Sequence, residues 1–303
     1  MFVLAHISDL HMALQPRLMQ LISKRGLGFI NWHRKRKHIH RRDILDEITR
    51  DLKAQTTDHI AVTGDLVNLS LPIEYERAAE WLRTIGSPQN VTVIPGNHDV
   101  YVQQVTQAPA QYWGDYMTGD DGGQRLPFLR RRNGVALIAL SSGVATGPFM
   151  ATGRLGARQL QRLAELLDQT RDAFRIVLIH HPPVSPPQRH LRRLIDAPDL
   201  RGVLAEKGAE LLLHGHDHQR ALVWLDGPDK NIPAIGVPSA SANAPHGDED
   251  GAGYHLFNID GGGGNWCCDM VARQRNADGA IGETERLSLY PLVPAKAGTQ
   301  AAF

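Results

Sequence analysis

Short apolar runs recur along the first 215 residues of the chain, and most of them lack the polar alternation of a half-exposed strand. They are rich in Val, Ile and Leu, as expected of strands that are buried on both faces. The runs predict strands at residues 2–7, 60–63, 91–94, 135–140, 176–179 and 211–213. Apolar residues at helical spacing predict helices around residues 44–52, 72–85 and 160–167. This alternation predicts an α/β fold in which the sheet is buried between helices.

Two regions depart from the alternation. Residues 101–133 contain a Gly- and Asp-rich turn and predict a long excursion or cap. Further along, the glycines at 261–264 separate apolar runs at 255–259 and 266–271, which predicts a β-hairpin. The last residues, 291–303, show no periodicity and are expected to fray.

Composition excludes several classes of protein. The chain has 303 residues, of which 42% are hydrophobic, so disordered and fibrous architectures are excluded. Its two cysteines, Cys267 and Cys268, are adjacent, which excludes a disulfide framework and a Cys-based zinc site. The N-terminal residues have neither a basic segment nor a sustained apolar stretch, so we expect a cytoplasmic protein without a signal peptide or transmembrane helix.

Charge is distributed unevenly along the chain. Residues 17–42 contain nine of the 33 Lys and Arg residues and none of the 32 Asp and Glu residues. The cations are mixed with apolar residues, a combination typical of a peripheral segment at an anionic membrane. A lid beside the substrate site, a nucleic-acid contact, or a helix pair that neutralises the acidic remainder would also fit. Our hypothesis is that residues 17–42 contact an anionic membrane.

Polar residues with metal-binding side chains follow five of the predicted strands. They are Asp9 and His11, Asp65 and Asn68, Asn97, His98 and Asp99, His180 and His181, and His214, His216 and His218. Because the carboxyl ends of strands in an open α/β sheet converge on one edge, these clusters are expected to share one site. In Asp-x-His and His-x-His, an extended chain would point both side chains the same way.

The residue types indicate two metal ions. Carboxylate, imidazole and amide groups without a thiolate suit Mn, Fe or Zn. Seven ligands drawn from these clusters would be too many for one ion, whereas two ions that share one carboxylate would use all seven. A dinuclear centre of this kind clamps a phosphoryl group and activates a bridging hydroxide.

Five motifs occur in a fixed order. They are Asp9-x-His11, Gly64-Asp65-x-x-Asn68, Gly96-Asn97-His98-Asp99, His180-His181-Pro182 and Gly215-His216-x-His218. In this order and spacing, the chain resembles the calcineurin-like metallophosphoesterase superfamily over residues 1–260. The resemblance implies a four-layer α/β/β/α sandwich, with residues 17–42 as a basic N-terminal insertion. Residues 261–290 would add a C-terminal β-hairpin packed on the same domain.

The resemblance also implies a role for each site residue. One metal would be held by Asp9, His11, Asp65 and His218, and the other by Asp65, Asn97, His180 and His216. His98 would protonate the leaving group, and Asp99 would orient the His98 ring. Asn97 would also stabilise charge on the phosphoryl oxygens. His181 would contact substrate or pack behind the ligands, and we favour packing.

The compact length, the HHPP motif and residues 253–257 look most like class III cyclic nucleotide phosphodiesterases. That likeness implies hydrolysis of a cyclic nucleotide or nucleotide-like phosphodiester, by a metal-bridging hydroxide with His98 as general acid.

Two alternatives stay open. One is a hydrolase of a pyrophosphate-linked lipid, similar to UDP-diacylglucosamine hydrolases, which the basic segment would suit. The other is a non-enzymatic metal-binding interaction module, against which the complete ligand set argues. No specific protein or nucleic-acid partner is inferred.

Overall fold

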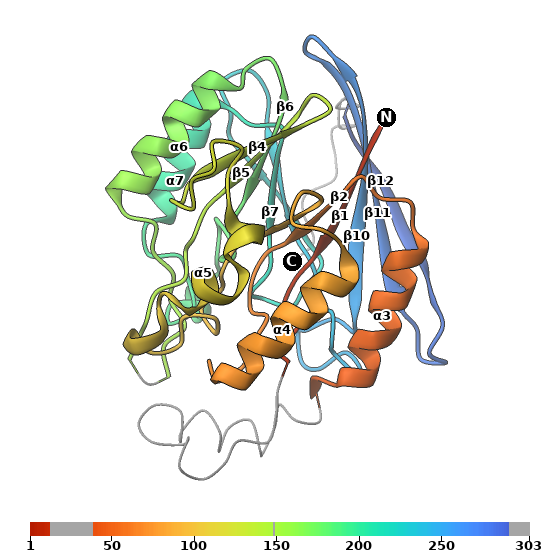
Figure 1. The fold of residues 1–303 in the computed structure, drawn as a ribbon. Coiled ribbons are helices and arrows are strands. Elements are labelled where there is room, and N and C mark those ends of the chain that lie inside the picture. The colour runs from red at the N-terminus through yellow and green to blue at the C-terminus, as the bar shows by residue number, and fades with distance from the viewer. Residues whose placement is uncertain (13–38, 148, 291–303) are drawn as a thin grey trace.

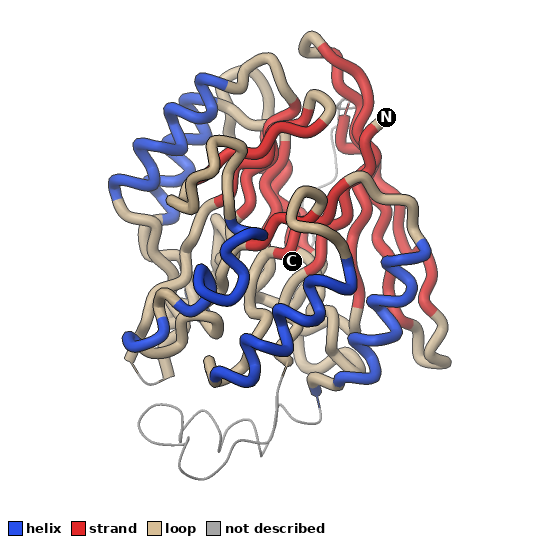
Figure 2. The backbone as a smooth tube through the Cα atoms, viewed as in Figure 1, coloured by secondary structure: helices blue, strands red, loops and turns tan. Residues whose placement is uncertain are grey.

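The computed structural model describes residues 1–12, 39–147 and 149–290. Two six-stranded sheets pack face to face, and helices cover their outer surfaces (Figures 1 and 2). The expected four-layer α/β/β/α sandwich is therefore confirmed. Residues 13–38, which include most of the basic segment, and the tail 291–303 lie outside the described residues.

The first sheet is mixed. Its strand order is β12-β11-β10-β1-β2-β3, and β1, β2 and β3 are parallel. The strands are β1 (Phe2–Ile7), β2 (His59–Val62), β3 (Val91–Val93), β10 (Gly253–Gly262), β11 (Asn265–Arg275) and β12 (Ile281–Tyr290). Helices α3 (Arg42–Ala54) and α4 (Pro72–Ile85) cover its outer face (Figure 1).

The second sheet has the order β4-β5-β6-β7-β9-β8, and β5, β6, β7 and β9 are parallel. Its strands are β4 (Phe128–Arg132), β5 (Val135–Ala139), β6 (Phe174–Leu178), β7 (Leu211–His214), β8 (Ala221–Leu225) and β9 (Ile232–Gly236). Helices α6 (Ala157–Gln169) and α7 (Ala197–Lys207) pack on the outer face of this sheet.

The strand β5 shows why the sandwich needs apolar residues at every position. Val135 and Leu137 face the core between the sheets, whereas Ile138 and Leu140, the residue after the strand, face α6 and α7. Successive side chains of a strand point to opposite faces, so a strand covered on both sides has no polar alternation. The six predicted strands accordingly appear as β1, β2, β3, β5, β6 and β7.

The predicted helices appear as α3, α4 and α6. Helix α4 begins at Pro72 and ends before Gly86, as expected of a proline in the first turn and a glycine at the C-cap. The region 101–133 holds η3 (Gln103–Val105), α5 (Ala108–Trp113) and η4 (Gly114–Met117), followed by β4.

Strand β4 was not predicted, because its sequence is rich in arginine. Arg130 is buried and donates hydrogen bonds to the carbonyl oxygens of Thr118, Pro88 and Val91, at 2.6–2.7 Å. These acceptors come from segments distant in sequence, so only the folded chain makes the position favourable for a cation.

The predicted hairpin is formed by β10 and β11, and β12 extends it by a third strand. Residue 260, the predicted end of the catalytic domain, lies within β10. Asp51 of α3 accepts hydrogen bonds from Arg273 of β11 and Tyr254 of β10, which ties the extension to the outer helix. None of the helices in the described ranges is both long and apolar enough to cross a membrane.

Candidate metal centre

The loops after five strands meet at one end of the sandwich. The turn after β1 pairs with the turn after β2, where Asp9 N donates to Gly64 O and His11 N donates to Asp65 O, both at 3.0 Å. His216 N, in the loop after β7, donates to Asp9 Oδ2 at 2.9 Å. The structure thus brings together residues that lie more than 200 positions apart in the chain.

Five of the seven expected ligands adopt a left-handed backbone conformation. The φ angles of Asp9, His11, Asp65, His216 and His218 lie between 45° and 72°. Such angles are uncommon for residues other than glycine, and they cluster at functional sites. The expectation that Asp-x-His and His-x-His lie on extended chain is therefore wrong, because turns rather than strand periodicity aim these side chains inward.

The motif glycines allow the ligand loops to approach one another. A Cβ atom on Gly96 would collide with Asp65 Oδ1, and one on Gly215 would collide with the side chains of Ser8 and Asp9. A larger residue at either position would push a predicted ligand away from the centre.

The first group of ligands surrounds Asp9. The Nε2 atoms of His11 and His218 lie 3.0 Å apart, and Asp9 Oδ1 lies 3.7 Å from the first and 3.2 Å from the second. Asp9 Oδ1 is buried and accepts no hydrogen bond from the described part of the chain. A buried carboxylate oxygen without a donor is costly, so the arrangement fits a cation at this position.

The second group surrounds His180. Its Nε2 atom lies 3.4 Å from Asp65 Oδ2, 3.2 Å from Asn97 Oδ1 and 3.3 Å from His216 Nδ1. Asp65 also lies within 4.8 Å of a ligand atom of His11, so its carboxylate stands between the two groups. This position suits a carboxylate shared by two ions.

The second ring nitrogen of three histidines is held by an acceptor. His180 Nδ1 donates to Thr63 O at 2.7 Å, and His216 Nε2 donates to Arg192 O at 2.8 Å. A carbonyl can only accept, so it places the proton on that nitrogen and leaves the lone pair of a neutral ring on the other. His180 Nε2 and His216 Nδ1 are thus the ring atoms that could hold a metal.

Glu249, which was not predicted from the sequence to belong to the site, holds the second ring nitrogen of His218. Its Oε2 atom accepts a hydrogen bond from His218 Nδ1 at 3.0 Å. Glu249 belongs to the polar loop 243–252, whose only sequence signal is its acidic character and its position after the last metal motif.

Buried carboxylates raise the pKa of two of the expected histidine ligands. Burial lowers the pKa of His180, but Asp65 outweighs burial and raises it to about 9. Burial also acts on His218, where Asp9 and Glu249 raise the pKa to about 9. A metal held by these two rings near neutral pH would therefore displace a proton from each of them.

His98 lies beside the ligands, but Asp99 does not orient it. His98 Nδ1 donates to the main-chain oxygen of Asn68 at 2.6 Å. The Asp99 carboxylate instead accepts hydrogen bonds from the amides of Leu66, Val67 and Gly96 at 2.8–3.1 Å. The expected Asp99–His98 contact is therefore wrong, and Asp99 holds together the loops that follow β2 and β3.

His181 is fully buried behind the ligands. Its Nδ1 shares a hydrogen bond with Ser142 Oγ at 2.8 Å, and its Nε2 donates to Ala151 O at 3.1 Å. The ring packs against His216, with centroids 4.2 Å apart. These contacts fit the packing interpretation and leave neither ring nitrogen for substrate. His214 is likewise buried, and its Nδ1 donates a hydrogen bond to Gly215 O.

His40 is a further histidine at the centre that sequence reasoning missed. It offers a ligand atom within 4.8 Å of those of His11 and His218, and its Nδ1 shares a hydrogen bond with Ser241 Oγ at 2.9 Å. It lies at the end of the basic segment, where its cationic neighbours drew attention to charge rather than to a ligand.

Comparison with known proteins agrees with this geometry. The model of the calcineurin-like phosphoesterase family matches residues 2–220. A protein of Synechococcus sp. named probable cyclic nucleotide phosphodiesterase is 29% identical over 176 residues, which span 56% of this chain and 61% of that protein.

One solved structure supports the fold, and a second is matched more weakly. Purple acid phosphatase PPD1 from yellow lupin is 12% identical, has a TM-score of 0.58, and is matched over 93% of this chain and 52% of its own. A 5′-nucleotidase precursor from Thermus thermophilus is 13% identical, with a TM-score of 0.44 over 95% of this chain and 54% of its own. The first likeness supports the fold alone, and the second is too weak to carry an argument.

Proposed function

Because the chain belongs to the calcineurin-like phosphoesterase family, we propose that it is a metal-dependent hydrolase of phosphodiesters, with a cyclic nucleotide or nucleotide-like substrate. The observation that carries the proposal is the pair of histidine–carboxylate groups on either side of Asp65. The name of the Synechococcus relative supports the diester substrate.

The donor set fits two divalent ions of the Mn, Fe or Zn type. Asp9, His11, Asp65 and His218 would hold one ion, and Asp65, Asn97, His180 and His216 would hold the other. When bound, such a pair of ions would polarise phosphoryl oxygens and lower the pKa of water, so that hydroxide is available near neutral pH.

The chain itself would supply the proton for the leaving group. The carbonyl of Asn68 keeps a proton on His98 Nδ1, so exchange of the second proton takes place at Nε2. The His98 amide donates to Asp65 Oδ1 at 2.7 Å, which fixes the general acid relative to the shared carboxylate. The amide group of Asn97 would stabilise charge on the phosphoryl oxygens.

The test compares bis(4-nitrophenyl) phosphate with 4-nitrophenyl phosphate, using metal-stripped protein with and without added manganese. We expect manganese-dependent cleavage that favours the diester. Preference for the monoester would contradict the substrate class. Two bound metals per chain without hydrolysis of either compound would favour a binding module instead.

Residues 17–42 carry the proposal of a peripheral contact with anionic membrane, which would suit a pyrophosphate-linked lipid as an alternative substrate. The nine cations without an acid support it. We expect liposomes containing phosphatidylglycerol to co-sediment with the full chain but not with a folded variant lacking residues 17–38. Equal co-sedimentation of the two would rule out this role.

A further inference from the structure

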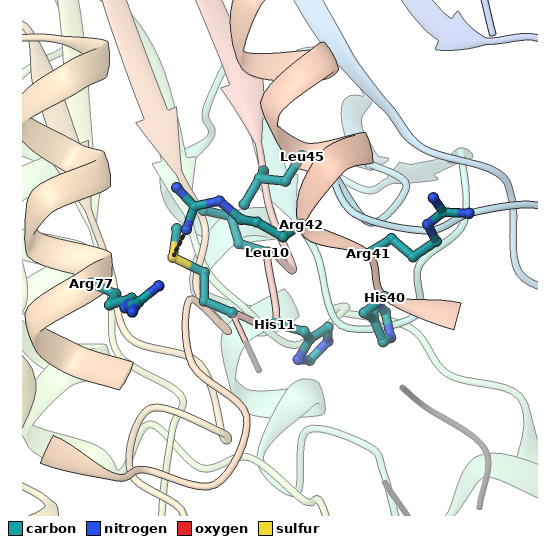
Figure 3. A pocket seen from close by; sticks show the side chains of 8 residues that line it. Leu10, His11, His40, Arg41, Arg42, Leu45 and Arg77 are labelled. Carbon is teal, nitrogen blue, oxygen red and sulfur yellow. Dashed lines mark hydrogen bonds between the residues drawn. The ribbon is translucent and has the colours of Figure 1, made fainter. Parts of the chain in front are cut away.

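A cavity of about 180 Å³ adjoins the metal centre between the first turn of α3 and the side of α4 (Figure 3). His11, an expected metal ligand, forms part of its wall, together with His40. The remaining polar lining consists of Arg41, Arg42 and Arg77. A ligand in this cavity would therefore lie beside any substrate held at the centre.

The cavity is strongly cationic. Three of its lining residues are arginines, and none of the described lining residues is acidic. Arg41 is paired with Asp43, and Arg42 with Asp46 at 2.9 Å, whereas Arg77 forms no ion pair with the described chain. Within the part of the chain that the structure describes, the positive charge on Arg77 thus has no carboxylate partner.

The orientation of the side chains concentrates this charge. Arg42 reaches from α3 and Arg77 from α4 toward the same space, whereas Arg41 points away from it (Figure 3). Asp46 accepts a hydrogen bond from Arg42 Nε, whereas Arg42 Nη1 lies 3.9 Å from Met12 Sδ, which is only a weak acceptor. Because Asp46 balances the charge of Arg42 but no described carboxylate pairs with Arg77, an anion bound in this space would stabilise the positive charge of Arg77.

Asp43 and Asp46 pair with Arg41 and Arg42, and the sequence before Asp43 supplies no further carboxylate as far back as Asp9. Residues 17–42 add only cations. The volume is also smaller than that of pockets that enclose a whole small molecule, which are typically about 300–1,000 Å³. The cavity fits a single charged group of a larger ligand.

We propose that this cavity binds a second phosphoryl group of the substrate, attached beyond the scissile phosphodiester. Guanidinium groups recognise phosphate oxygens through charge-assisted and often paired hydrogen bonds. The inference rests on the proposed function and narrows it to diesters that carry an additional phosphate.

The test uses two substrates with the same leaving group, 4-nitrophenyl phenyl phosphate and its derivative with a phosphonate on the phenyl ring. With manganese, we expect the full chain to show a kcat/KM about tenfold higher for the phosphonate derivative. In Arg77→Gln and in the double variant R42Q/R77Q, this ratio should fall toward one. Arg83→Gln, a charge-matched change on the same helix, should keep the ratio and the activity of the original chain.

A second measurement separates this inference from the proposed function. Inorganic phosphate titrated into the metal-free protein should bind the original chain and R83Q with similar affinity. It should bind R42Q/R77Q at least tenfold more weakly. Equal phosphate binding in the folded double variant, or equal cleavage of both substrates by the original chain, would overturn the cavity proposal. If neither substrate is cleaved, the proposed function fails, whereas the phosphate titration still decides whether the cavity binds anions.

Discussion

Replacement of Glu249 by Gln removes the negative charge behind His218 while preserving the size of the side chain. In the structure, Glu249 Oε2 accepts from His218 Nδ1 at 3.0 Å, and the opposite ring nitrogen lies 3.2 Å from Asp9 Oδ1. The carboxylate therefore orients the ring and increases the electron density on the nitrogen that faces the centre. Gln can still accept a hydrogen bond, so Glu249→Gln tests charge more than geometry.

The magnitude follows from the environment of the pair. Loss of a partner behind a metal-binding histidine typically weakens metal affinity about 10–100-fold. The Glu249 side chain is 25% exposed and the His218 side chain 4%, so solvent screens one end of the interaction. We therefore expect the lower end of the range, about tenfold, or about 1.4 kcal/mol.

The assay is competition for Mn²⁺ between metal-stripped protein and a fluorescent chelator at pH 7. Asp248→Asn is the matched control, because it removes the same charge from the adjacent loop position, where the side chain is 85% exposed. We expect the control to bind Mn²⁺ as tightly as the original chain. A folded Glu249→Gln protein with unchanged affinity would refute the assigned role of Glu249.

Three further predictions concern His98, the expected histidine ligands and Asp51. His98→Ala should lower turnover about 10²–10⁴-fold yet keep its metal by elemental analysis, and loss of metal would show that His98 is a ligand. Binding of Mn²⁺ at pH 7 should release close to two protons, because His180 and His218 have pKa values of about 9, and the apparent affinity for Mn²⁺ should therefore rise with pH. Calorimetry in buffers of different ionisation enthalpy would detect the released protons, and binding without proton release would contradict the prediction. Asp51→Ala should lower the free energy of unfolding by about 2 kcal/mol, measured with urea at pH 7. Burial opposes ionisation of Asp51, but hydrogen bonds from Arg273 hold its pKa below the usual range. The stabilising contribution of Asp51 is therefore present at neutral pH and should vanish as the pH falls through this lowered pKa. An unchanged difference in unfolding free energy between the original chain and Asp51→Ala at acidic pH would contradict this role of Asp51.

The strands could be predicted where burial on both faces left a local signature. In β5, the residues that face the second sheet and those that face the helices are all apolar, so the sequence shows an unbroken run. Strand β8 is partly exposed, with Trp224 42% exposed, and β12 carries Glu283, Glu285 and Arg286. Those strands are defined by pairing with neighbours, which a local pattern does not record.

The identity of the ligand residues could be predicted, but their supporting contacts could not. Motif order places Asp, His and Asn at the strand ends, and the structure brings all seven expected ligands together. The acceptors that hold the second nitrogen of the histidine rings carry no such sequence signal. Two are main-chain carbonyls, of Thr63 and Arg192, and any residue type supplies a carbonyl. The third, Glu249, lies 31 residues beyond its histidine, so only the folded chain reveals the pair.

The two sides of the centre differ in a way that bears on substrate choice. Behind the His180 group, His181 and Ser142 form a buried, hydrogen-bonded wall. Beside the His11 group, the wall contains the arginine-lined cavity. Metal ligands alone would treat any accessible phosphodiester alike, because they contact the group that is common to all of them. If the cavity binds phosphate, discrimination between diesters arises on the His11 side, and Arg42 and Arg77 control which substrates are cleaved without taking part in the cleavage itself.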